Sequence, residues 1–81
     1  MLTELQTQNK LVGLKQSIRA VESGKVKKVF LAADSEAKIQ TPVRRACANK
    51  NIEIEEVPTM KDLGNACGIN IGAAVAVILC D

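Results

Sequence analysis

Two uninterrupted apolar runs most constrain how this chain of 81 residues can fold. They are the segments 27–33 (KKVFLAA) and 73–80 (AAVAVILC), which are short and rich in strand-forming residues. Strands that are apolar without alternation are typical of the middle of a sheet whose two faces are both covered by helices. The two runs therefore predict buried strands with helices packed on them.

The remaining segments alternate between helix and strand. An apolar stripe of Leu14, Ile18 and Val21 predicts a helix over 14–23, which Gly24 ends. The other expected elements are a short helix over 3–9 with Leu5 inward, one helical turn over 36–40 capped by Asp34-Ser35, a helix from Pro42 to about Lys50 with Thr41 as its N-cap, a half-exposed strand over 52–57, and a helix over 60–67 that Thr59 caps and Gly68 ends. This order predicts an α/β fold, a single domain over residues 1–81 built as a three-layer α/β/α sandwich around a small mixed sheet.

The composition argues against several classes of protein. The chain has no histidine, and its cysteines, Cys47, Cys67 and Cys80, form no CxxC pair. A metal site and a cysteine–histidine catalytic pair are therefore not expected. Phosphate-binding and dinucleotide-binding fingerprints are missing, so we expect no cofactor and no small-molecule substrate. No apolar run approaches the ~20 residues of a membrane helix, and the first residues lack signal-peptide order, so we expect a cytoplasmic protein without membrane contact.

The charge of the chain is distributed unevenly. Residues 1–50 carry ten Lys or Arg and four Asp or Glu, a net charge of +6, whereas residues 51–81 carry one Lys and five acids, a net charge of −4. A basic half beside an acidic half favours an anionic partner, although solvated charged faces produce the same asymmetry. Phe30 is the one aromatic residue, which excludes RNA recognition by bases stacked on aromatic side chains.

The helix expected at 14–23 starts with the sequence GLKQSIR, residues 13–19. Lys15, Gln16 and Arg19 fall opposite the apolar stripe, where the two cations repel each other and Lys15 opposes the helix dipole. Gly13 allows another backbone to come close, and without a side-chain cap the first helical amides are left to a partner. Such a face can bind phosphate and read guanine edges, or it can be an ordinary solvated face. The residues alone leave both interpretations open.

A second unusual segment is LGNACGINIGAA, residues 63–74. Gly68 ends the expected helix, which leaves Ile69, Asn70 and Ile71 in a loop before the last strand. Two β-branched apolar residues in a loop are unfavourable unless they are buried or covered by a partner. They either tuck into the core or form a small apolar platform for an unstacked base.

At this separation, the two segments resemble those of the kink-turn RNA-binding ribosomal proteins, the superfamily of the large-subunit proteins seven-Ae and thirty-e, and in particular its small bacterial members. The resemblance covers almost the whole chain: GLKQSIRAVESGKVKKVFLAAD at 13–34, the following helix with NIEIEEVP to residue 58, and KDLGNACGINIGAAVAVI at 61–78. It implies a thirty-e-like α/β/α sandwich and a non-catalytic partner of structured RNA containing a kink-turn, such as ribosomal RNA or a riboswitch, with the ribosome as a further candidate. No self-association surface is evident, so a monomer is expected.

A kink-turn is a helix–bulge–helix in which tandem sheared G·A pairs sharpen a bend. The resemblance assigns to the G·A pairs, in the widened major groove, Gly13, Lys15, Gln16 and Arg19. It assigns to the extruded bulge nucleotides Ile69, Asn70 and Ile71. Position and charge suggest, as contacts to the RNA backbone, Lys25, Lys28 and Lys61.

The chain departs from the archaeal members, which carry Asn-Glu in place of Lys15-Gln16 and lysine in place of Arg19. The site is therefore more cationic, and we expect its affinity to depend more on salt. Two other hypotheses are a structural ribosomal or ribosome-associated protein that contacts ribosomal RNA without selecting kink-turns, and a protein–protein adaptor that uses the loop 69–71. A thiol enzyme is disfavoured, because Cys67 lies near a helix C-terminus and has no histidine.

Overall fold

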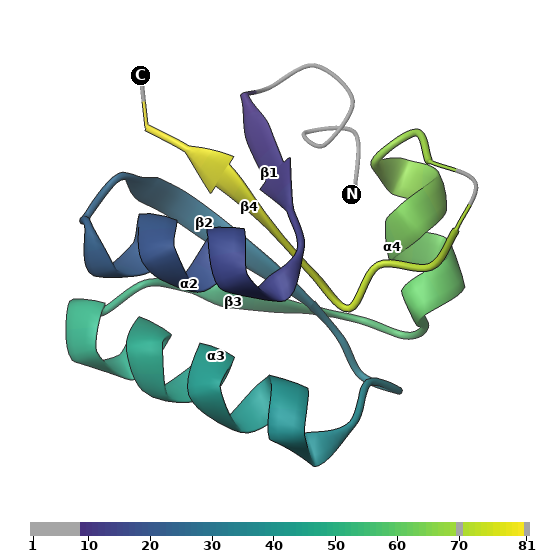
Figure 1. Cartoon of the computed structure of the whole chain (residues 1–81), viewed down its shortest axis with the longest axis horizontal. Helices are drawn as coiled ribbons and strands as arrows, with labels where there is room; N and C mark the ends of the chain where they lie inside the picture. Colours follow the sequence, from purple (N-terminus) through teal and green to yellow (C-terminus); the bar gives the residue numbers. More distant parts are fainter. Residues whose placement is uncertain (1–8, 70, 81) are drawn as a thin grey trace.

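The computed structural model describes residues 9–69 and 71–80, in which strands and helices alternate along the chain (Figure 1). The elements are β1 (Lys10–Val12), α2 (Leu14–Glu22), β2 (Val26–Ala32), α3 (Ala37–Lys50), β3 (Ile54–Val57), α4 (Met60–Ala66) and β4 (Val75–Leu79). The strands form a mixed sheet in the order β1-β4-β2-β3, in which β2 and β3 are parallel and the other neighbours antiparallel. The predicted α/β fold with a small mixed sheet is confirmed. Within the described residues, no helix has the length and apolar character to cross a membrane.

Helices cover both faces of this sheet. α2 and α3 pack on one face, over a cluster of buried residues that includes Val29 and Leu31 of β2. α4 packs on the other face, over a cluster that includes Phe30 and Ala32 of the same strand. Figure 1 shows α2 and α3 side by side, with α4 apart from them. The alternating residues of β2 thus enter opposite clusters, which confirms the three-layer α/β/α sandwich.

The start of the chain differs from the sequence-based expectation. The predicted helix over 3–9 lies outside the described residues except for Asn9, which is not helical. The unpredicted strand β1 pairs with β4, with Leu11 opposite Val77. Three residues are too few to show a periodicity, and such a strand forms because a neighbouring strand satisfies its backbone groups.

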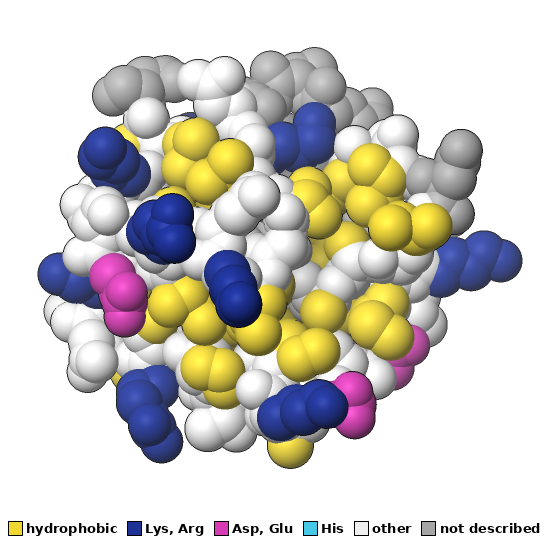
Figure 2. All heavy atoms as spheres, viewed as in Figure 1, with side chains coloured by type: hydrophobic (Ala, Val, Ile, Leu, Met, Phe, Trp, Pro, Cys, Tyr) yellow, Lys and Arg dark blue, Asp and Glu magenta, His cyan; other side chains and the backbone are white. Residues whose placement is uncertain are grey.

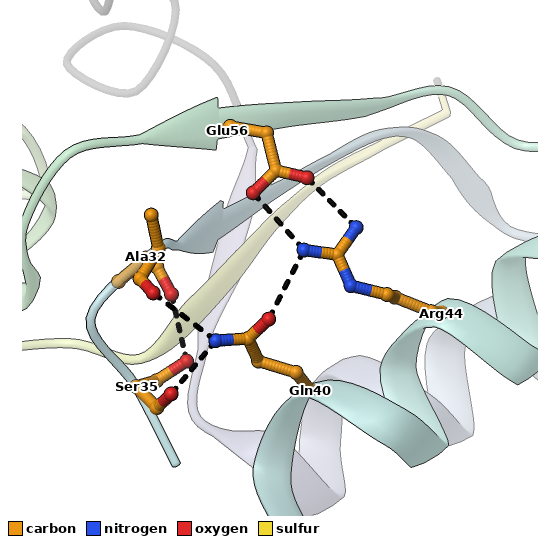
Figure 3. Close-up of polar contacts among 6 residues, drawn as sticks. Ala32, Ser35, Gln40, Arg44 and Glu56 are labelled. Carbon is orange, nitrogen blue, oxygen red and sulfur yellow. Dashed lines mark hydrogen bonds and ion pairs between the residues drawn. The ribbon is translucent and has the colours of Figure 1, made fainter. Parts of the chain in front are cut away.

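The prediction that Thr41-Pro42 opens the long helix is wrong, because α3 begins at Ala37 and continues through Pro42. Proline cannot donate to the carbonyl four residues before it, so α3 lacks the hydrogen bond to the Lys38 carbonyl. Gln40 stabilises that start, since its side-chain amide donates to the backbone oxygens of Ser35 and Ala33 at 2.7 and 3.2 Å (Figure 3). The single turn expected over 36–40 is therefore the beginning of α3.

The start of α4 has two caps, of which one was predicted. The Asp62 N–H donates to Thr59 Oγ1 at 3.0 Å, which confirms Thr59 as the N-cap. The Met60 N–H donates to Asp34 Oδ1 at 2.8 Å. The sequence places Asp34 in a cap for the following helix, but Glu36 occupies that N-cap position. The carboxylate of Asp34 instead complements the free amides and the dipole at the start of α4.

Candidate nucleic-acid interface

α2 begins without a side-chain cap. Gly13 occupies the N-cap position with φ 119° and ψ 153°, a conformation that residues with a side chain rarely adopt. Its N–H donates to the Val75 carbonyl at 3.0 Å, and its own carbonyl accepts from the Ser17 N–H at 3.1 Å. Among the described residues no side chain caps α2, so its first amides have no side-chain acceptor at the positive end of the helix dipole.

The exposed face of α2 carries the polar residues that the sequence predicts there. Lys15, Gln16 and Arg19 are all exposed. Figure 2 shows Lys and Arg side chains over this helix. The structure therefore places the three predicted side chains on one accessible surface, together with the uncapped end of the helix.

The buried face of α2 is rotated from the predicted apolar stripe. Leu14 and Ile18 are only partly buried, whereas Ser17 and Ala20 join Val21 in the buried set. Small side chains let the helix approach the sheet closely, a property that an apolar pattern does not reveal. The Ser17 hydroxyl is buried and has no hydrogen-bond partner among the described residues.

The loop from α4 to β4 folds back on α4. The Ile69 N–H donates to the Gly64 carbonyl at 3.1 Å, and the Ala73 N–H donates to the Met60 carbonyl at 3.0 Å. The Ile71 carbonyl lies so close to Gly64 that a Cβ at this position would overlap it. Gly64 is thus a position that sequence reasoning missed. Its signal is a glycine inside a helix, which costs about 1 kcal/mol against alanine and so indicates a packing reason.

The two isoleucines of this loop have different surroundings. Ile69 is partly buried and packs against the core cluster under α4. Ile71 is 74% exposed, and within the described part of the chain it is the large apolar residue that stands out on the surface. Asn70 lies outside the described residues. The core alternative is thus confirmed for Ile69. Ile71 is exposed, and its part in an apolar platform for a base stays a prediction.

The start of α2 lies beside the chain that leads from the loop into β4. The hydrogen bond from Gly13 to Val75 joins the start of α2 to the first residue of β4, shortly after the loop. Figure 1 shows the start of α2 beside the chain that enters β4. Gly13 is therefore joined to the chain just after the second segment, which ends at residue 74.

Lys25 extends the α2 face toward the end of the helix. It follows the turn after α2 and is exposed. With Gln16 and Arg19 it lines an open hollow of about 300 Å³, whose apolar lining includes Leu11 and Leu79. Sequence reasoning missed the two leucines because one belongs to the unpredicted strand β1 and the other to the end of β4.

Lys28 and Lys61 lie elsewhere. Lys28 forms an ion pair with Glu55 at 2.7 Å, and its Nζ lies 5.1 Å from the centre of the Phe30 ring. Phe30 belongs to the core cluster on the α4 side of the sheet, opposite α2. Lys61 is an exposed residue of α4. Of the three predicted backbone contacts, the structure therefore brings only Lys25 to the α2 face.

The cysteines are expected to react very differently with an alkylating agent. Burial raises the pKa of the Cys47 thiol, and burial also raises that of Cys67, against a smaller opposing effect of the Lys10 charge. Cys80 is exposed. Iodoacetamide at neutral pH should therefore modify Cys80 first, and mass spectrometry of the folded protein should find the other two thiols unmodified until denaturant is added. Rapid modification of Cys67 in the folded protein would reopen the thiol-enzyme hypothesis.

Comparison with known proteins identifies one family. The model of the "Ribosomal protein L7Ae/L30e/S12e/Gadd45 family" matches residues 2–81. An RNA-binding protein of Caldanaerobacter subterraneus is 43% identical over 67 residues, which cover 83% of this chain and 82% of that protein. The RNA-binding protein YbxF of Geobacillus stearothermophilus is 39% identical over 75 residues, which cover 93% and 92%.

A ribosomal protein and a solved structure also match this chain. The large ribosomal subunit protein eL8 of Halobacterium salinarum is 35% identical over 68 residues, which cover 83% of this chain and 57% of that protein. Among solved structures, a Giardia lamblia 15.5 kD RNA binding protein superposes with a TM-score of 0.88 at 25% identity, covering 99% of this chain and 69% of that one.

Proposed function

Because the chain belongs to the ribosomal protein L7Ae/L30e/S12e/Gadd45 family, we propose that it binds kink-turn RNA and stabilises the bent form. Relatives with the names RNA-binding protein and large ribosomal subunit protein support an RNA partner. In this proposal the whole chain acts as one non-catalytic domain, a monomer in the cytoplasm. Its target is a structured RNA such as ribosomal RNA or a riboswitch.

The proposal rests on the hydrogen bond between Gly13 and Val75, which holds the start of α2 beside the chain leaving the loop 69–71. An RNA that reaches both must present its G·A pairs to the helix and its bulge to the loop at the same time. A kink-turn has these two features next to each other, at the bend. A straight duplex has no extruded bulge to offer.

The side chains on the α2 face have complementary tasks in this complex. Lys15 can donate to guanine O6 and N7, the Gln16 amide can pair with a base edge, and Arg19 can reach a base or a phosphate. The exposed Ile71 side chain can cover an extruded base by apolar contact, since no aromatic platform is needed for one nucleotide. The cations and the free helix amides offset the repulsion between phosphates that the bend brings together.

Stabilisation of the bend follows from differential affinity alone. A protein that contacts both features only in the bent RNA binds that form more tightly and shifts the population toward it. Moving an RNA from 1% to 99% bent requires ~10⁴-fold tighter binding to the bent form. Several charge-assisted hydrogen bonds that the protein can make simultaneously only with the bent form can supply such a ratio.

The test is binding to a kink-turn duplex with a fluorophore at each end, at stated salt concentrations. Its control is the same duplex with Watson–Crick pairs in place of the sheared G·A pairs. We expect tight binding and a rise in energy transfer between the fluorophores only for the intact motif. Equal, weak and steeply salt-dependent binding to both RNAs would instead favour a protein that contacts RNA without selecting kink-turns.

A further inference from the structure

α3 carries two cations, Lys38 and Arg45, that are not among the residues predicted to contact RNA. The buried side of this helix consists of Val43, Ala46 and Cys47. Arg44 turns toward β3, where its guanidinium donates to both carboxylate oxygens of Glu56 at 2.7 and 3.1 Å (Figure 3). Arg44 also holds the pKa of the Glu56 carboxyl below its ordinary value. The Arg44 guanidinium is thus already paired with a carboxylate of the protein itself.

The other side of α3 faces α2 across a groove. This groove has a volume of about 410 Å³, and its α2 wall contains Leu14, Lys15, Ile18, Arg19 and Glu22. Pro42 lines the α3 wall. Lys38 and Arg45 stand four residues before and three residues after Pro42, so they share its face of the helix.

Lys38 and Arg45 are both exposed. Within residues 9–69 and 71–80, Arg45 makes no ion pair, and Lys38 reaches only Glu36, at 3.8 Å with both side chains more than 70% exposed. Ion pairs that are so exposed contribute little. Figure 2 shows the result as one surface: Lys and Arg over α2, hydrophobic side chains between the helices, and Lys and Arg over α3.

We propose that the groove between α2 and α3 binds the sugar–phosphate backbone of one duplex arm of the RNA, with Lys38 and Arg45 contacting its phosphates. This inference rests on the proposed function, because the groove shares Lys15 and Arg19 with the α2 face. In this arrangement, a duplex arm of the RNA that extends from the G·A pairs at Lys15 passes over the groove and then over α3. The packed helix axes are 8–10 Å apart in general, so Lys38 and Arg45 lie within reach of the same duplex.

The charges favour RNA over a protein in this groove. Lys15 and Arg19 line the groove together with the acid Glu22. Helical spacing adds Lys38 and Arg45 on the Pro42 face of α3, where Lys38 has the exposed Glu36 as its neighbour. A protein partner in the groove would compete with RNA for Lys15 and Arg19. The apolar strip of Leu14, Ile18 and Pro42 is partly buried and has no aromatic residue of the kind that anchors many protein–protein interfaces.

The test compares the double variant Lys38→Gln/Arg45→Gln with Arg44→Gln. The control removes a cation from the same helix, next to Arg45 in the chain but facing β3. Each protein is titrated by fluorescence anisotropy with RNAs that have either long arms or arms cut to a few base pairs, at several salt concentrations. The unmodified protein is measured with the same RNAs, so that arm truncation reports on the groove without any substitution.

We expect the double variant to lose about tenfold in affinity for the long-arm RNA, and the slope of log K against log salt to shrink by about 1 per lost cation. The loss should disappear with one arm truncated, and the unmodified protein should lose a similar factor on that truncation. Arg44→Gln should bind like the unmodified protein.

Unchanged affinity and salt slope of the double variant, or an equal loss in Arg44→Gln, would overturn the proposal and leave the groove to an acidic protein partner. A loss that persists on the truncated RNAs would also overturn it. Failure of the proposed function is a separate result: binding without preference for the G·A pairs. In that case, plain duplexes of two lengths can still show whether the affinity lost by the double variant depends on duplex length.

Discussion

Replacing Lys15 with alanine is expected to weaken kink-turn binding by about 1–3 kcal/mol, with no loss of folding stability. The lysine is exposed, and in the proposed complex its charge and base-edge donors contact the RNA. Alanine is the better helix former, and the change removes a cation near the helix N-terminus and a like-charge pair with Arg19, so the free energy of unfolding should stay equal or rise by a few tenths of a kcal/mol. Anisotropy titration and urea denaturation measure the two effects separately.

A matched control for this change is Lys50→Ala. Lys50 is an exposed lysine at the last residue of α3, and the substitution removes the same charge. We expect it to leave affinity for the intact kink-turn almost unchanged. If Lys15→Ala and Lys50→Ala reduced affinity equally, the basic half of the chain would act as a diffuse phosphate-binding surface, and the assignment of the α2 face would be wrong.

Gly64→Ala is expected to destabilise the fold and to displace the loop 69–71. A Cβ at this position would overlap the backbone carbonyl of Ile71, and a backbone atom cannot move aside as a flexible side-chain end can. Alanine in place of a helical glycine otherwise stabilises by about 1 kcal/mol, whereas forcing extra atoms into packed structure costs about 1–3 kcal/mol. The clash should therefore win, and thermal melting should show a midpoint several degrees lower, at ~4–8 °C per kcal/mol for a domain of this size.

Ile71→Asp tests the contribution of the apolar side chain to RNA binding separately from the position of the loop. Because Ile71 is 74% exposed, this variant should melt like the unmodified protein. It should nevertheless bind the kink-turn more weakly, since it places a negative charge where an extruded nucleotide would lie. An Ile71→Asp protein that unfolds would mean that the side chain belongs to the core, and a Gly64→Ala protein that melts higher would mean that the loop yields without cost.

The sequence-based predictions succeeded where the signal is local. The helix over 14–23 and the caps at Gly24 and Thr59 depend on residues within one or two turns of each other, and the structure places them within a residue or two. The predictions failed where the partner is distant. β1 forms against β4, and Asp34 caps a helix that begins at Met60. Neither contact has a periodicity that a single segment can display.

The candidate site divides in the same way. The exposed face with Lys15, Gln16 and Arg19 follows from helical spacing, and the α/β/α layering follows from apolar strands that must be buried on both faces. The sequence by itself thus determined the layers and which side chains α2 offers to a partner, because periodicity acts through neighbouring residues. Only the tertiary structure decided that the start of α2 lies beside the first residue of β4, and that Pro42 of α3 faces α2 across a groove. Those arrangements come from hydrogen bonds and packing between residues that are far apart in the chain, such as Gly13 with Val75.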